Sequence, residues 1–353
     1  MEDLILFYPE GHQAHFEAGH PESPDRIEIV RNSLAAAGWW DPFPCIPPLD
    51  LPLSFLERVH DSRYLKELEL ACHQGLRLDS DTYTTPSSWQ LALNAAGGAA
   101  GVAEAVWNAS SDYPNNPKKR GFSLSRPPGH HAERKRGMGF CLINNIAVAA
   151  EYLISGKQNE AQNANRIAIV DLDLHHGNGT QDIFWQRRDV LFVSTHQSPL
   201  YPGTGQMEEV GEGDGFGFNL NLPFPPGTGD IGYRVAMDEI ILPMLGRFQP
   251  EMILVSLGFD PHWRDPLGHL LLTAAGYGGL VKSLVEWADQ HCRSRISLVL
   301  EGGYDPIAVS ACALATTAAL LGEPIKDTAG SSPRPQGKSW QTIITKAKSI
   351  WDL

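Results

Sequence analysis

The chain has 353 residues, of which 42% are hydrophobic and 20% are charged, a composition typical of a folded globular protein rather than a disordered chain. No apolar run approaches the roughly 18–20 residues that a membrane span needs. Lys and Arg number 28 against 41 Asp and Glu, and this net charge of −13 argues against a nucleic-acid backbone binder while being compatible with cationic ligands, or with solubility alone.

Short apolar runs predict buried β-strands, and the segments between most of them have the apolar spacing of α-helices. The predicted strands cover residues 4–8, 121–125, 166–171, 190–196, 218–222, 252–257 and 296–300. The predicted helices cover residues 24–38, 54–75, 87–107, 144–155, 231–248, 273–291 and 306–321. Continuous apolar runs are typical of parallel strands covered on both faces, so we expect one α/β domain over residues 1–325. Residues 326–353 are predicted to form a loosely packed tail or a short helix.

The N-terminal residues and the cysteines bear on the cellular compartment. Residues 1–8 lack the basic start and the longer apolar core of a signal peptide, so we expect a cytoplasmic protein that does not associate with membranes. The cysteines are odd in number, scattered, and without a Cys-x-x-Cys pair: Cys45, Cys72, Cys141, Cys292 and Cys312. This pattern argues against a disulfide framework and against a thiolate zinc site.

Unusual polar residues follow four of the predicted strands, in segments 126–131, 171–179, 258–260 and 301–304. In open parallel sheets the ligand crevice lies outside the carboxyl ends of the strands. We therefore expect the His, Asp and Tyr side chains of these four segments to meet at one edge of the sheet.

Segment 171–179 predicts a metal site. If the strand continues to His175, its period of two places Asp171, Asp173 and His175 on one side. Asp173 and His175, with Asp260 as a third ligand, form an oxygen–nitrogen set that suits zinc or another divalent transition metal and leaves a coordination position open. The alternative is that these carboxylates cap the helix that follows. His176 faces away in this geometry and is expected to be structural.

Three further side chains are candidates for proton transfer and charge stabilisation. His130 and His131 follow a Pro-Pro-Gly turn, and imidazoles beside a metal serve as general base and acid. Tyr304 follows two glycines and could donate its hydroxyl to an oxyanion. Taken alone, the histidines could be surface residues and Tyr304 could be ordinary packing.

Together these motifs resemble the histone deacetylase family, nearer to its class II and bacterial amidohydrolase members than to class I. The resemblance extends from about residue 20 to residue 304 and rests on segments 126–131, 137–141, 171–181, 201–205, 258–260 and 301–304. It implies the arginase–deacetylase fold, in which a mostly parallel sheet is flanked by helices on both faces.

The resemblance also implies a role for each matching residue. The zinc ligands correspond to Asp173, His175 and Asp260, and the catalytic group corresponds to His130, His131, Tyr304, Asp171 and Asn178. Asn178 stands where class I members usually have Asp, which favours class II. The walls of a narrow acyl-lysine tunnel correspond to Gly139, Phe140 and Tyr201, and its rim to Asp81 and Leu267. Asp171 and Ser194 match a family site for a structural potassium ion.

The implied activity is hydrolysis of an N-acetyl-lysine-type amide to acetate and a free amine, with one Zn²⁺ per chain and Fe²⁺ or Co²⁺ as substitutes. Acetylated lysine in proteins and small acetylated amines both remain as substrates. The polyamine-deacetylating branch has a Glu where this chain has Leu267, which weakens that alternative. A two-metal arginase-like hydrolase and a non-catalytic acyl-lysine sensor are further alternatives. The sequence leaves the physiological substrate and the oligomeric state open.

Overall fold

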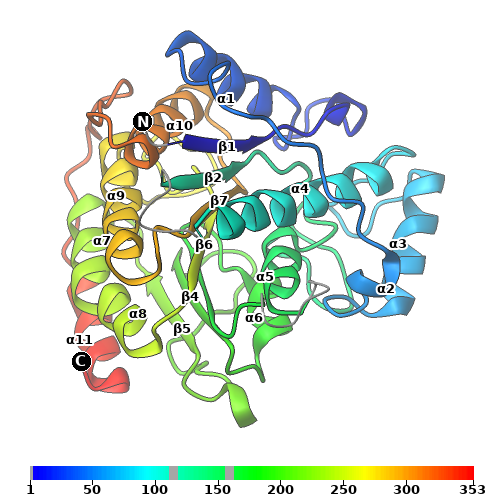
Figure 1. Ribbon diagram of the computed structural model, residues 1–353. Coiled ribbons are helices and arrows are strands. Elements are labelled where there is room, and N and C mark those ends of the chain that lie inside the picture. Colours follow the sequence, from blue (N-terminus) through cyan, green and yellow to red (C-terminus); the bar gives the residue numbers. More distant parts are fainter. Residues whose placement is uncertain (1–2, 111–117, 156–162) are drawn as a thin grey trace.

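A single parallel sheet forms the centre of the computed structural model, which describes residues 3–110, 118–155 and 163–353 (Figure 1). The sheet has seven strands in the order β1-β2-β7-β6-β3-β4-β5, and every neighbouring pair is parallel. The strands are β1 (Asp3–Phe7), β2 (Lys119–Ser123), β3 (Ile167–Asp171), β4 (Val190–Gln197), β5 (Asn219–Phe224), β6 (Met252–Leu257) and β7 (Ile296–Leu300). The predicted α/β fold with a parallel sheet is confirmed.

Helices cover both faces of this sheet (Figure 1). One face carries α1 (Asp25–Ala36), α7 (Asp230–Ala236), α8 (Leu242–Phe248), α9 (Ala274–His291), α10 (Pro306–Leu321) and α11 (Trp340–Trp351). The other carries α2 (Leu53–Leu56), α3 (Ser62–Gln74), α4 (Ser88–Ala109), α5 (Asn145–Ser155) and α6 (Asn178–Phe184). A π-helical turn, Met237–Ile241, joins α7 to α8.

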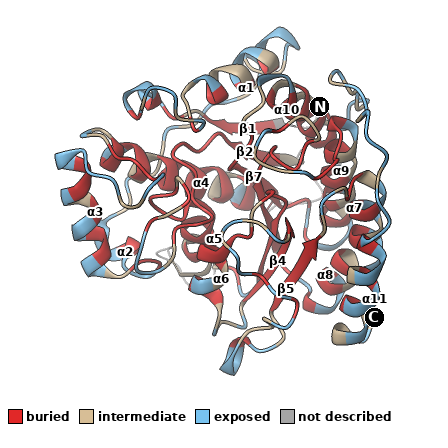
Figure 2. Ribbon diagram, turned by 180° about the vertical axis from the view of Figure 1, so that it is seen from behind, coloured by how far each residue is buried: buried red, intermediate tan, exposed pale blue. Residues whose placement is uncertain are grey.

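The alternation of side chains along each strand explains why the apolar runs are continuous. In β3, Ala168 and Val170 join the core on one face, whereas Ile167 and Ile169 join the core on the other. All five residues of this strand are buried, as Figure 2 shows for the central strands in general. Because both faces are dry, most strand positions carry apolar side chains, and the few polar ones, such as Ser194, Asn221 and Ser256, are buried among them.

The observed elements differ from the predicted ones in three places. The predicted helix 54–75 is two helices, because the chain turns between α2 and α3 and Asp61 caps α3 by accepting a hydrogen bond from the Arg63 backbone N–H at 2.8 Å. The short helix α6 is absent from the predicted helices and entered only through the alternative in which the carboxylates cap a following helix. Within the predicted tail, α11 buries Trp340, Ile344 and Ala347 against the core.

No helix in the described part of the chain is long and apolar enough to cross a bilayer. The cytoplasmic location and the division into residues 1–325 and 326–353 stay predictions.

Candidate active site

Strand β3 ends at Asp171, so the strand does not continue to His175 as the sequence analysis supposed. The side chains nevertheless keep alternating beyond its end. Leu172 and Leu174 are buried in the core, while Asp171, Asp173 and His175 face the carboxyl edge of the sheet together with side chains that follow β6, β7 and β2. The polar segments predicted to meet at one edge do meet there.

Asp173, His175 and Asp260 form a compact cluster that could hold a metal ion. One ligand atom from each residue lies within 4.8 Å of the others, and within the described residues no other group of three His, Cys, Asp or Glu side chains does this. His175 Nδ1 lies 3.2 Å from both Asp173 Oδ1 and Asp260 Oδ2. Asp260 Oδ2 is buried and makes no hydrogen bond to any described residue. Two buried carboxylates that share one imidazole are costly without further positive charge, and this ligand set therefore fits a divalent cation.

Backbone groups fix the orientation of both carboxylates. Asp173 accepts hydrogen bonds from the backbone N–H of His175 at 2.8 Å and of Gly302 at 2.9 Å. Asp260 accepts one from the backbone N–H of Leu174 at 3.0 Å. None of these bonds caps α6, whose N-terminus has no side-chain cap, so the capping alternative is not supported. Because the bonds connect three separate loops, those after β3, β6 and β7, the cluster is preorganised by the fold.

Glycine is needed where the backbone passes closest to this cluster. A Cβ atom at Gly258 would overlap the carboxylate of Asp173, and one at Gly302 would overlap that of Asp260. We expect Gly258→Ala to displace Asp173, to weaken metal binding by about 10–100-fold and to lower the free energy of unfolding by about 1–3 kcal/mol.

Metal content by elemental analysis and the thermal midpoint Tm of the chelated protein measure these two effects. Gly279→Ala is the matched control, because Gly279 lies in α9 with nothing within 4 Å of its virtual Cβ. If Gly258→Ala retained metal as tightly as Gly279→Ala does, the cluster would not be the metal site.

The tandem histidines are oriented by different partners. His130 Nδ1 lies 3.0 Å from Asp171 Oδ2, and His131 Nδ1 lies 2.7 Å from Asn178 Oδ1. The centres of the two imidazole rings are 4.0 Å apart, and both side chains are buried. Each ring therefore uses its Nδ1 for orientation and leaves its Nε2 for chemistry.

These partners give the two histidines opposite charge preferences. Burial disfavours the charged form of His130, but the carboxylates of Asp173 and Asp171 outweigh burial and raise its pKa to about 10. Burial, and then the positive charges of His130 and His175, hold the pKa of His131 well below its usual value. His131 is thus the neutral imidazole of the pair, the form that can accept a proton at neutral pH. A cation bound by Asp173 would offset part of the charge that acts on His130.

Two buried glutamates that the sequence analysis did not assign support this arrangement. Glu301 accepts hydrogen bonds from the backbone N–H of Gly129 at 2.7 Å and of His130 at 3.1 Å. Glu22 pairs with Arg126 at 2.7 Å and with Arg26 at 3.2 Å, all three side chains being buried. Arg26 also donates through Nε to the Gly303 carbonyl oxygen at 2.6 Å, so Glu22 connects the histidine loop to the Tyr304 loop.

A narrow pocket of 240 Å³ leads from the surface to these groups. It is lined by Asp81, Pro128, His130, His131, Gly139, Phe140, Cys141, His175, Leu200, Tyr201, Leu267, Gly302 and Tyr304. All five predicted wall and rim residues line it. Phe140 has a left-handed backbone, φ 69°, and its N–H donates to Thr82 Oγ1 at 3.1 Å. Such a conformation is unusual for an aromatic residue and fixes its ring as a wall.

Asp265, which was not assigned from the sequence, connects the backbone of Tyr304 to that of the rim residue Leu267. Its carboxylate accepts hydrogen bonds from the backbone N–H of Tyr304 at 2.7 Å and of Leu267 at 3.0 Å. Burial raises the pKa of Tyr304 well above its usual value, so its hydroxyl is protonated and able to donate. The guanidinium of Arg26 lies 4.9 Å from the centre of the Tyr304 ring and supports its position.

The expected potassium site and His176 are the two remaining features predicted from the sequence. Asp171 and Ser194 are paired across β3 and β4, which brings together the residues of the expected potassium site. His176 is buried outside the pocket and bonds Thr204 Oγ1 at 2.8 Å and Gln181 Oε1 at 3.0 Å, as a structural histidine would.

Comparisons with known proteins agree with this geometry. The family model of the histone deacetylase domain matches residues 20–320. A probable deacetylase of Archaeoglobus fulgidus is 41% identical over 302 residues, which is 85% of this chain and 80% of that protein. The histone deacetylase-like amidohydrolase of Pseudomonas aeruginosa is 36% identical over 318 residues, 88% of this chain and 80% of that protein. The solved structure of the HDA15 HD domain superposes with a TM-score of 0.86 at 34% identity, covering 99% of this chain and 94% of that one.

The parallel sheet with its polar carboxyl edge defines an enzyme of the arginase–deacetylase fold. Within that fold the chain belongs to the histone deacetylase family, and it is a deacetylase or amidohydrolase of that family. The resemblance found in the sequence is confirmed.

Proposed function

We propose that this enzyme is a metal-dependent deacetylase of N-acetyl-lysine-type amides, which it hydrolyses to acetate and a free amine. The observation that carries the proposal is the narrow pocket. Its outer walls are apolar side chains, and the tandem histidines, Tyr304 and His175 of the metal cluster lie together in its lining. A slender, uncharged acetylated chain fits such walls, and its amide would reach the polar groups.

The chain's own residues supply most of the chemistry. When bound by Asp173, His175 and Asp260, Zn²⁺ would polarise the acyl oxygen and lower the pKa of water, and Fe²⁺ or Co²⁺ would substitute. His131 takes a proton from the attacking water and later protonates the leaving amine. His130, held by Asp171, stabilises charge, and the Tyr304 hydroxyl donates to the oxyanion.

Two alternatives from the sequence have less support. A two-metal arginase-like hydrolase needs a second ligand set beside the first, and the described residues offer one such cluster. Elemental analysis near two metal ions per chain would favour it. A non-catalytic sensor has no need of His130, His131 and Tyr304 in these positions, and turnover of a fluorogenic acetyl-lysine amide would exclude it.

Substrate choice depends on the rim of the pocket. Acetylspermidine carries ammonium groups beyond its acetylated end, and a carboxylate at the rim attracts them. Leu267 supplies an apolar rim, which favours acetyl-lysine, whereas Asp81 supplies one carboxylate. We expect acetyl-lysine peptides to be turned over faster than acetylspermidine. We also expect Leu267→Glu to move the ratio of kcat/KM toward acetylspermidine by roughly tenfold, equivalent to about 1.4 kcal/mol.

Rates on acetyl-lysine peptides, acetylpolyamines and small N-acetyl amides, compared side by side, test this expectation. Asp81→Asn is the companion variant, because it removes the negative charge of the rim carboxylate and keeps the size of the side chain. A wild-type preference for acetylspermidine that Asp81→Asn abolishes would mean that Asp81, not Leu267, sets the specificity. The structural K⁺ at Asp171 and Ser194 stays a prediction that potassium-dependent stability would test.

A further inference from the structure

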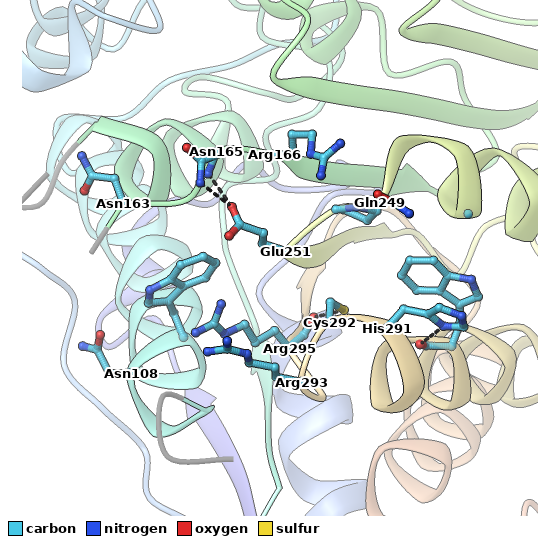
Figure 3. Close-up of a pocket in the computed structure, with 14 residues that line it drawn as sticks. Asn108, Asn163, Asn165, Arg166, Gln249, Glu251, His291, Cys292, Arg293 and Arg295 are labelled. Carbon is cyan, nitrogen blue, oxygen red and sulfur yellow. Dashed lines mark hydrogen bonds between the residues drawn. The ribbon is translucent and has the colours of Figure 1, made fainter. Parts of the chain in front are cut away.

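A second and larger pocket, of 1120 Å³, lies at the amino ends of the strands, opposite to the active site. Figure 3 shows the side chains that line it. Its floor is built from residues that directly precede three strands: Arg166 before β3, Glu251 before β6 and Arg295 before β7. Its sides come from the last residues of α4 and α9, including Trp107 and His291. No part of the mechanism above uses this pocket.

Its charge is opposite to that of the whole protein. Arg166, Arg293 and Arg295 line it, and Glu251 is its one acidic lining residue. The carboxylate of Glu251 is already used, because it accepts hydrogen bonds from Asn165 through the backbone N–H at 2.6 Å and the side-chain amide at 3.2 Å. The chain has a net charge of −13, yet the three guanidinium groups of this pocket face a single carboxylate in its lining.

Among the three arginines of this pocket, Arg295 gives the strongest indication of an anion site. Its side chain is 6% exposed, yet Nε makes no hydrogen bond to any described residue, and no described acidic group forms an ion pair with it. Its guanidinium carbon lies 3.6 Å from the centre of the Trp107 ring, which fixes it in place. Burial, and then repulsion from Arg293, lower the pKa of Arg295 to about 10, so the pocket holds a charge that an anion would stabilise.

The ends of helices offer a competing explanation, since helix C-termini attract cations. In α9, however, the last carbonyl groups are already satisfied. The Ala288 carbonyl accepts from the backbone N–H groups of Cys292 and Ser294, and the Trp287 carbonyl is bonded by His291 Nδ1 at 2.9 Å. Among the described residues, neither Arg293 nor Arg295 uses its guanidinium to cap a carbonyl. The arginines are therefore not explained as caps.

We propose that this pocket binds a small organic phosphate, with its phosphate group on Arg293 and Arg295. Guanidinium forks match the oxygens of a phosphate, and both side chains extend in the same direction into the pocket (Figure 3). Arg166 lies at the upper rim, and amide side chains of Asn163 and Gln249 are available to the uncharged part of the ligand. The volume suffices for a nucleotide-sized molecule.

Titration calorimetry of the full chain at constant ionic strength tests this proposal, with inorganic pyrophosphate and AMP as probes and citrate as a carboxylate comparison. Both phosphates should bind saturably and citrate should not. Arg293→Gln should weaken binding about tenfold or more, because it removes one charged fork from an exposed position. Arg63→Gln is the control, since Arg63 is exposed on α3, far from the pocket in sequence, and forms an ion pair with Glu67.

Three results of this experiment would overturn the proposal of a phosphate site. Absence of saturable binding, equal binding of citrate, or equal binding by Arg293→Gln and Arg63→Gln would each do so. Arg293→Gln should leave deacetylation of an acetyl-lysine peptide unchanged, so that failure here is distinguishable from failure of the proposed function.

Discussion

Removal of divalent metal with a strong chelator is expected to abolish deacetylation, and added Zn²⁺ or Co²⁺ is expected to restore it. The reason is the donor set: Asp173, His175 and Asp260 offer two carboxylates and one imidazole within 4.8 Å, and Asp260 Oδ2 has no hydrogen bond among the described residues. Three protein ligands of this kind hold a divalent transition metal and leave a position open. Turnover of an acetyl-lysine peptide and elemental analysis of the same preparation provide the measurement.

Asp260→Asn tests whether the loss of activity on chelation arises at the Asp173, His175 and Asp260 cluster. It keeps the size of the side chain and removes one charge, so bound metal and activity should fall together. Gly279→Ala, whose added methyl group would meet no atom within 4 Å, should retain both. Full activity in a verified metal-free preparation would contradict the mechanism.

Tyr304→Phe is expected to lower kcat by about 10²–10³ while leaving metal content unchanged. The substitution keeps the ring, and with it the packing against Arg26 and Phe140, and removes only the hydroxyl that would donate to the oxyanion. Because that donor acts in the transition state, kcat should fall much more than KM changes. Steady-state kinetics on an acetyl-lysine peptide measure both constants.

Tyr201→Phe is the matched control, since Tyr201 lines the same pocket as a wall. It should keep most of the wild-type kcat. If Tyr304→Phe kept more than about a tenth of the activity, Tyr304 would be a wall residue too, and the oxyanion would need another donor.

The positions of most strands and helices were predictable, because each depends on the spacing of apolar residues within its own segment. The strands β6 and β7 begin and end at the predicted residues, since each is a buried apolar run bounded by polar residues. The break between α2 and α3 was missed because both helices are apolar on the inside and the turn depends on Asp61 as a cap. Helix α6 was considered only in the capping alternative, because its seven residues overlap the polar motif after β3 and show no apolar spacing of their own.

Local patterns are enough to find the chemically unusual residues, because Asp-Leu-Asp-Leu-His-His and Pro-Pro-Gly-His-His are short, contiguous and poorly suited to a core. Their family resemblance then indicated a metal site and a tunnel. The distant groups that hold these motifs in place become visible in the three-dimensional structure alone. Glu22 reaches Arg126 across 104 positions and Glu301 reaches Gly129 across 172, pairings that no local pattern encodes. Likewise, Arg166, Arg293 and Arg295 look like ordinary surface charges in sequence, and they form one pocket only because parallel strands bring their amino ends to the same edge.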